Sequence, residues 1–115
     1  MDSLKKQQDH YQYYISEAAE AAAQHEAEIV DDADVLRMYL EEAIEKHDDH
    51  IAVIYVTKML KLAKFSSDHI DIAKILRKHS DLQDYFSITE CIQKAKDSAK
   101  IPGDWQEIEQ FLTDY

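Results

Sequence analysis

Glycine, proline and cysteine are almost absent from this sequence, because its 115 residues contain only one of each. Hairpin turns and phosphate-binding loops need glycine where the backbone turns sharply, and Gly103 is the only one in the chain. The lone Cys91 forms no internal disulfide, and nothing near it has the spacing of a zinc site. These absences disfavour β folds, phosphate-binding loops and disulfide scaffolds. They favour helices joined by short polar turns.

Long apolar runs are also missing. The longest runs from Ile51 to Val56, whereas a membrane-spanning helix needs about 20 apolar residues. No charged segment followed by an apolar one opens the sequence. With 45% hydrophobic residues the composition is that of a globular protein rather than a disordered one. We therefore expect a soluble cytoplasmic protein with its cysteine reduced.

Helical periodicity predicts the elements in the first half of the chain. A first helix is expected over residues 3–28, with one face formed by Leu4, Tyr11, Ile15, Ala18, Ala22 and Ile29. Asp31 is expected to cap a second helix, whose inner face is formed by Leu36, Leu40, Ala43 and His47. Residues 51–64 begin with a β-branched run. We interpret them as a helix because no partner strand exists and the apolar run continues to helical length.

Serine and aspartate residues mark the starts of the later helices. The expected caps are Ser66 or Ser67, Ser80 with Gln83, Ser87 with Glu90, and Asp104 with Glu107. Helix faces are expected to bury Ile70, Ala73, Leu76, Ile88, Cys91, Ile92 and Ala95, and a last helix carries Trp105, Ile108 and Leu112. The predicted fold is all-α: one compact domain over residues 1–115, with about six short helices around a central apolar helix at 51–64. We find no internal repeat.

Signatures of catalysis are missing. A helical di-metal site needs Glu three residues before His, and no histidine here has it. The segment His47-Asp48-Asp49-His50 has the His-x-x-His spacing of a metal site, but its aspartates favour a helix-capping junction. We interpret Cys91 as a small core residue. We therefore expect no catalytic residue, no cofactor and no metal.

The lysine-rich middle of the chain raises the question of DNA binding. Residues 51–100 carry nine basic side chains against six acids, and Ala73 fits the small position of a helix-turn-helix. Arg77 and Lys78, however, stand where that motif has glycine and an apolar residue, and the would-be reading helix 80–86 has two acids and no base. We expect no direct nucleic-acid binding, with a degenerate helix-turn-helix regulator as one alternative.

One resemblance involves the same region. The spacing of four short segments is similar to that in the helices of small addiction-module antidote proteins. The segments are Asp34-Val35, Tyr39-Leu40-Glu41, Ala43-Ile44 and Ile72-Ala73-Lys74. Those proteins carry a helix-turn-helix downstream, where this sequence departs from the pattern. No residue role is carried over from them.

Charge is the strongest functional signal. The net charge is −11, and residues 1–50 hold 14 acids against 4 bases. Carboxylates three or four residues apart on a helix repel one another by a few tenths of a kcal/mol per pair, so such a row has a cost in stability. A solvated acidic face that only maintains solubility is the simpler interpretation. The candidate partner-binding residues are Glu17, Glu20, Glu28, Asp31, Asp32, Glu41, Glu42, Glu45, Asp48 and Asp49.

The favoured hypothesis is a small non-enzymatic inhibitor that docks on a basic, nucleic-acid-handling protein and mimics nucleic-acid charge. A phage-encoded antagonist of a host nuclease, of the anti-CRISPR type, has this chemistry. The alternative is an antitoxin or immunity protein that neutralises a basic toxin by the same means. The aromatic residues Trp105, Phe111 and Tyr115 leave a homodimer open as well.

Overall fold

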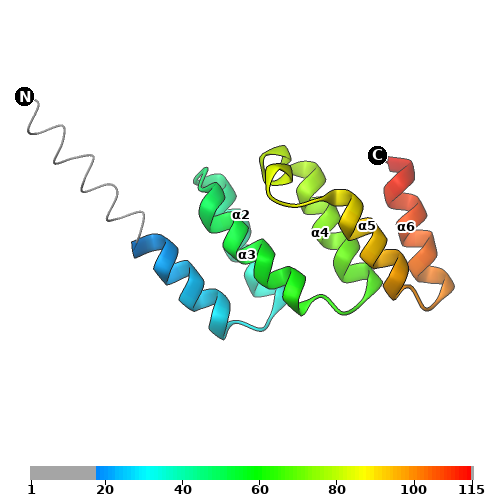
Figure 1. Ribbon diagram of the computed structural model, residues 1–115, viewed down its shortest axis with the longest axis horizontal. Helices are drawn as coiled ribbons and strands as arrows, with labels where there is room; N and C mark the ends of the chain where they lie inside the picture. The colour runs from blue at the N-terminus through cyan, green and yellow to red at the C-terminus, as the bar shows by residue number, and fades with distance from the viewer. Residues whose placement is uncertain (1–17, 115) are drawn as a thin grey trace, which may run out of the picture. The chain divides into compact units, whose positions relative to one another are not determined.

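The computed structural model describes residues 18–114, and every regular element in that range is helical (Figure 1). A helical segment at 18–29 precedes α2 (Ala33–Glu45), α3 (Asp49–Leu62), α4 (Ser66–Lys78), the 3-10 helix η1 (Ser80–Asp84), α5 (Ile88–Ser98) and α6 (Pro102–Asp114). The predicted all-α fold is confirmed. Across this range, no helix combines the length and the apolarity needed to cross a membrane.

The chain divides into two compact units, Met1–Tyr55 and Val56–Tyr115, and helix α3 continues from one unit into the other. Each unit is described by itself below. The expectation that residues 1–115 form one domain stays a prediction.

The first unit buries alanines and leucines. In the segment 18–29 the buried residues are Ala23 and Ala27, whereas Ala18, Ala22 and Ile29 are exposed, so the predicted inner face was wrong. Alanine occupies so many positions of this segment that the spacing fits several faces equally well. The predicted residues 3–17 lie outside the described part. Helix α2 buries Leu36, Leu40 and Ala43 as predicted.

His47 is not an inner residue of α2, as the sequence had suggested. It is exposed, and its φ of 56° places it in the left-handed region that ends a helix. Asp48 follows, and its Oδ1 accepts a hydrogen bond from the backbone N–H of Ile51 at 3.2 Å. The junction at 47–50 therefore ends α2 and caps α3, as predicted. Residues 51–62 are helical rather than extended, which confirms the interpretation of the β-branched run.

The second unit packs three helices together. Helix α4 contacts α5, α6 and η1, and α5 also contacts α6. In Figure 1, α4 and α6 run in one direction and α5 in the other. The core of this unit is formed by Val56, Met59, Ile70, Ile72, Ala73, Ile75, Leu76, Leu82, Cys91, Ala95, Ile108 and Phe111.

Two of the serine caps predicted in this unit are wrong. Helix α4 begins after Phe65, and Ser66 is buried with a hydroxyl that has no hydrogen-bond partner. Ser80 provides no side-chain cap to η1, and the Gln83 amide donates instead to the carbonyl of Leu76 at 3.0 Å. Ser87 does cap α5, because its Oγ accepts from the N–H of Glu90 at 3.2 Å.

Aspartates at the third helical position cap α4 and α6 in the same way. Asp68 Oδ2 accepts from the backbone N–H groups of Lys64 and Phe65 at 3.1 and 3.0 Å. Asp104 Oδ2 accepts from those of Lys100 and Ile101 at 2.9 and 3.3 Å. Each carboxylate thus accepts from two backbone N–H groups in the turn that leads into its own helix.

These two turns form a repeat, contrary to the expectation that the sequence contains none. Residues 63–68 read Ala-Lys-Phe-Ser-Ser-Asp, residues 99–104 read Ala-Lys-Ile-Pro-Gly-Asp, and the two segments are 36 residues apart. The helices that follow, α4 and α6, have the same length and the same 36-residue offset. A partial third copy, Ala27, Ile29 and Asp32, lies another 36 residues earlier. The shared pattern has only three identities per turn, so it is recognised only once the hydrogen bonds are known.

Candidate functional site

The candidate site is the exposed side of helix α2. Leu36, Leu40 and Ala43 turn inward, and this fixes which residues the helix presents to solvent. Asp34, Met38, Glu41 and Glu45 are all exposed and follow one another at steps of four, three and four residues. This spacing places them in one row, with Glu41 and Glu45 about 6 Å apart along the axis. We call these four residues the α2 stripe.

Not all predicted acids are available for a partner, because several have a structural role. Asp32 Oδ1 accepts from the N–H of Asp34 at 2.9 Å, so it is Asp32, not Asp31, that caps α2. Asp48 caps α3, and half-buried Asp49 belongs to the first turn of that helix. Glu42 Oε1 forms an ion pair with Lys46 Nζ at 2.9 Å, and this bond raises the pKa of Lys46.

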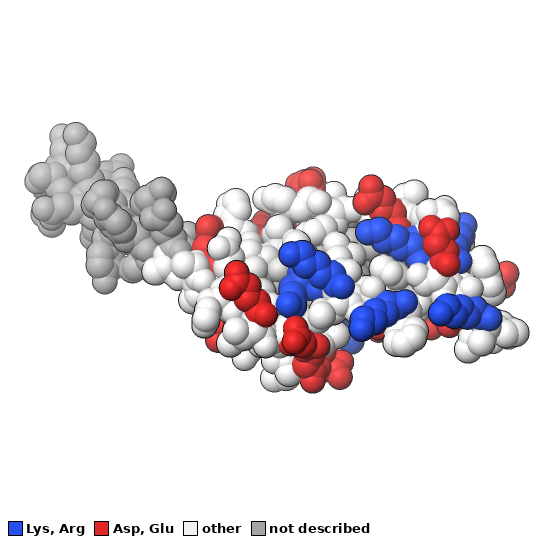
Figure 2. Space-filling view, turned by 60° about the horizontal axis from the view of Figure 1, so that its bottom comes forward, with Lys and Arg blue, Asp and Glu red and all other residues white. Residues whose placement is uncertain are grey.

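The remaining predicted acids lie on the preceding segment and the connection to α2. Glu20 is half-buried, Glu28 and Asp31 are exposed, and Glu17 lies outside the described residues. On the face drawn in Figure 2, acidic and basic side chains are interspersed rather than separated. A continuous negative surface built from all ten acids therefore stays a prediction. Among them, Glu41 and Glu45 belong to one exposed row, which also includes Asp34.

A cluster of Glu26, Tyr39 and Tyr55 lies beside α2 and was not predicted from the sequence. The Tyr39 and Tyr55 rings lie 5.6 Å apart at an interplanar angle of 31°. The charge of Glu26, a hydrogen bond to its carboxylate and partial burial raise the pKa of Tyr39. Burial and then the Glu26 charge raise the pKa of Tyr55. The cluster joins segment 18–29, α2 and α3, and thus supports the frame on which the stripe is held.

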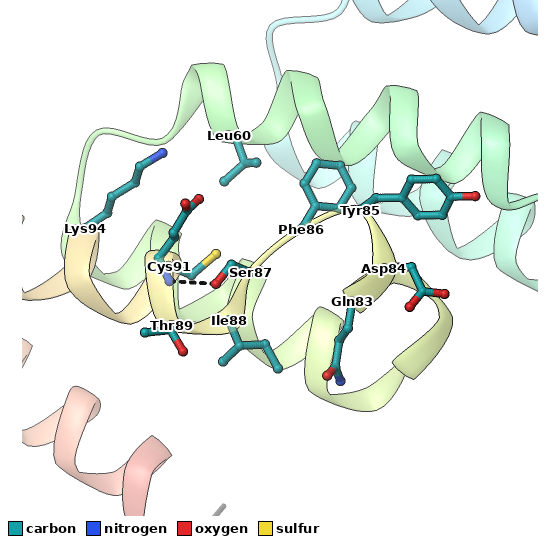
Figure 3. Close-up of a pocket in the computed structure, with 11 residues that line it drawn as sticks. Leu60, Gln83, Asp84, Tyr85, Phe86, Ser87, Ile88, Thr89, Cys91 and Lys94 are labelled. Carbon is teal, nitrogen blue, oxygen red and sulfur yellow. Dashed lines mark hydrogen bonds between the residues drawn. The ribbon is translucent and has the colours of Figure 1, made fainter.

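A second candidate is a pocket of about 550 Å³ in the second unit (Figure 3). Its lining combines apolar groups with one lysine and two acids, and the residues are Leu60, Gln83, Asp84, Tyr85, Phe86, Ser87, Ile88, Thr89, Glu90, Cys91 and Lys94. Cys91 is buried, as predicted, and this burial raises the pKa of its thiol. A protonated thiol is a poor nucleophile, so this burial disfavours nucleophilic chemistry at Cys91.

The residues predicted for a reading helix adopt another structure. Ser80–Asp84 form a five-residue 3-10 helix that carries Asp81 and Asp84. Recognition helices are longer, and they present donors rather than carboxylates to DNA phosphates. Within residues 18–114, moreover, no group of three or more His, Cys, Asp or Glu side chains is placed to hold a metal ion.

His69 is a buried titratable group of the second unit, as is Cys91. His69 projects from α4, its side chain is buried, and its Nδ1 has no hydrogen-bond partner. Burial first, and then the nearby Lys94 charge on α5, lower its pKa below the usual 6.5, while Asp68 acts in the opposite direction. The unfolded chain therefore takes up this proton at a higher pH than the folded chain does.

This shift predicts a loss of stability in mild acid. The contribution of His69 is complete above pH 6.5 and is lost as the pH falls from 6.5 towards the lower folded-state pKa. We expect His69→Gln to flatten the fall in the free energy of unfolding between about pH 7 and pH 5, measured by urea titration. His25→Gln is the control because His25 is exposed. A slope that is unchanged in His69→Gln, or equally changed in both variants, would contradict the prediction.

Comparisons of the chain with models of protein families, with curated proteins and with solved structures found no match.

Proposed function

We propose that this protein binds a basic, nucleic-acid-handling protein through the α2 stripe and inhibits it by occupying its nucleic-acid site. The observation that carries the proposal is the row Asp34, Glu41 and Glu45, exposed on one side of a helix. A helix holds these charges at fixed separations, so little conformational entropy is lost when a partner binds them.

The position of Met38 supports a protein partner. This flexible apolar side chain is exposed between Asp34 and Glu41. Interfaces are enriched in methionine, and exposed methionines adapt to partner surfaces. A purely solubilising face has no need for an apolar group at its centre. The stripe therefore combines charge for steering with one apolar contact.

Local charge supports the same proposal. The first unit holds 14 acids and 4 bases, whereas the second holds 10 acids and 9 bases. The negative field is therefore concentrated in the part of the chain that contains α2. Such a field accelerates encounter with basic partners and is screened by salt over about 10 Å at 0.1 M ionic strength.

The test is capture of basic proteins at controlled ionic strength. The immobilised chain is incubated with the heparin-binding fraction of a candidate host lysate, at about 50 mM salt, and eluted with rising salt. We expect nucleic-acid-binding proteins to be retained and then released before about 0.5 M salt. An eluted nuclease or polymerase should lose activity when the chain is added back. Retention that is independent of salt, or an empty eluate, would contradict the proposal.

A further inference from the structure

The 36-residue repeat makes α4 and α6 comparable position by position. Ile72 and Ile75 of α4 correspond to Ile108 and Phe111 of α6, and all four are buried. The two helices therefore turn the same side towards the core of the second unit. A difference in side-chain exposure between matched positions therefore shows how the surroundings of α6 differ from those of α4.

Two matched positions differ sharply in burial. His69 and Leu76 of α4 are 6% and 0% exposed, and α4 packs against α5, η1 and α6. Their counterparts in α6, Trp105 and Leu112, are 46% and 45% exposed. The position of Leu112 also corresponds to Leu40 of α2, which is fully buried. Helix α6 thus presents to solvent the side that α4 buries against neighbouring helices.

The exposed apolar groups of α6 form one row. Trp105 and Leu112 are seven residues apart, which is two helical turns and about 10 Å along the axis. Ile101, four residues before Trp105 and 60% exposed, extends the row beyond the start of the helix. A row with anchors at i, i+4 and i+11 fits the side of another helix, which contacts its partner at similar intervals. We call Ile101, Trp105 and Leu112 the α6 row.

Charge decides what kind of helix fits. Residues 101–115 contain four acids and no base, and Glu109 is exposed one turn after Trp105. A second copy that docked through the same row would bring these carboxylates against their own kind, which is unfavourable. A helix with lysine or arginine beside an apolar face would complement both the row and its acidic border.

We propose that the α6 row is a docking surface for a basic amphipathic helix of a partner protein. Trp105 provides the main contact, since a half-exposed tryptophan at the centre of an apolar row gains the most from being covered. Leu112 extends the apolar contact by two turns, and Glu109 pairs with a cation of the partner. This surface belongs to the second unit and does not depend on the function proposed for the α2 stripe.

Trp105 is the only tryptophan of the chain, so its fluorescence reports on this surface directly. The probe is a synthetic helical peptide with leucine at i, i+4 and i+7 and lysine elsewhere, titrated into the full chain. We expect a blue shift and saturable binding, because the indole moves from water into an apolar contact. A peptide with glutamate in place of lysine should leave the emission unchanged.

Two matched variants localise the binding. Leu112→Asp should weaken binding of the lysine peptide by at least about tenfold. Ile29→Asp, the same kind of change at an exposed apolar residue of the segment 18–29, should leave it unchanged. Leu112→Ala, a milder change at an exposed position, should weaken binding in the same direction. Circular dichroism confirms that each variant is folded.

Four results would overturn the proposal. The Trp105 emission would not respond to the lysine peptide, or it would respond equally to the glutamate peptide. The Leu112→Asp and Ile29→Asp variants would bind the lysine peptide with the same affinity, which would indicate unspecific attraction to an acidic chain. An emission shift that depends on the concentration of the chain alone would assign the α6 row to a second copy.

Discussion

Replacing Glu41 and Glu45 together by lysine is expected to lower affinity for the captured basic partner on the order of 100-fold at low salt. The two side chains lie in the same exposed row, so the double substitution replaces two attractive charges by two repulsive ones at one place. Like charges across an interface cost several kcal/mol, whereas loss of an exposed ion pair alone costs about 1 kcal/mol or less. Calorimetry or surface plasmon resonance at two salt concentrations measures the effect.

The control has to separate local charge from net charge. Asp81→Lys with Asp97→Lys changes the net charge by the same amount, at two exposed residues of the second unit. We expect this control to retain most of the affinity, since the substituted residues lie outside the α2 stripe. If both double variants lose affinity equally, binding follows the overall charge of the chain and the stripe has no specific role.

A neutral variant separates the loss of attraction from the added repulsion. Glu41→Gln with Glu45→Gln removes the attraction without adding repulsion, and its loss should be smaller than that of the lysine variant. The difference between the two should decrease as salt rises, because screening reduces repulsion and attraction alike. Glu42→Gln should have a smaller effect than Glu41→Gln, since Glu42 is already paired with Lys46.

The sequence was sufficient where several signals agreed. Leu36, Leu40 and Ala43 follow helical spacing within a segment of strong helix-forming residues, and all three are buried. Residues 51–62 were correctly interpreted as a helix because length and the lack of a partner strand outweighed β propensity. In α2 local preference and packing favoured the same answer. For residues 51–62 the lack of a partner strand decided against the local β preference.

The sequence was insufficient where one residue type had two possible roles. A serine near a helix start predicts a cap, yet α4 is capped by Asp68, whose carboxylate accepts two backbone N–H groups, and Ser66 is buried. The capping residue of α4 is thus one or two residues later than expected. Glu26 was overlooked for a similar reason, because its proximity to Tyr39 depends on how α2 packs against the segment 18–29.

The candidate site was predictable in its residue types but not in its extent. Acidic spacing on α2 identified Glu41 and Glu45, which are both exposed. The same spacing gave no sign that Asp32 and Asp48 hold helix ends or that Glu42 pairs with Lys46. An aspartate that caps a helix and an aspartate that binds a partner are the same residue type in the sequence. They differ only in which backbone N–H groups lie within reach.

The sequence left open whether Trp105 belongs to the core or to an interface, and in the structure both Trp105 and Leu112 are exposed. Ile108 and Phe111 face the core instead, since an inner face centred between them leaves the other two at its border. A face through Trp105 and Leu112 and a face through Ile108 and Phe111 are both apolar. The rotation about the helix axis that separates them is smaller than the angle between successive residues. Only the position of the neighbouring helices α4 and α5 decides between them.

Substitution of Phe111 is expected to cause a large loss of stability in the second unit. The Phe111 side chain is 1% exposed, and the Arg77 guanidinium lies 4.3 Å from its ring centroid. Phe111→Ala should lower the free energy of unfolding by about 3–5 kcal/mol, because it removes a buried aromatic side chain and leaves a cavity. The loss of the cation–π contact adds to this effect. Urea unfolding followed by Trp105 fluorescence reports on the second unit.

Phe65→Ala is the matched control for this experiment. The substitution is the same and lies in the same unit, but Phe65 is 65% exposed. Asp68 caps α4 through the backbone N–H of residue 65, which alanine retains, so the cap should persist. We therefore expect a change within about 1 kcal/mol. Equal destabilisation by the two variants would mean that α6 does not pack on α4 through Phe111, and the comparison of α4 with α6 would lose its structural basis.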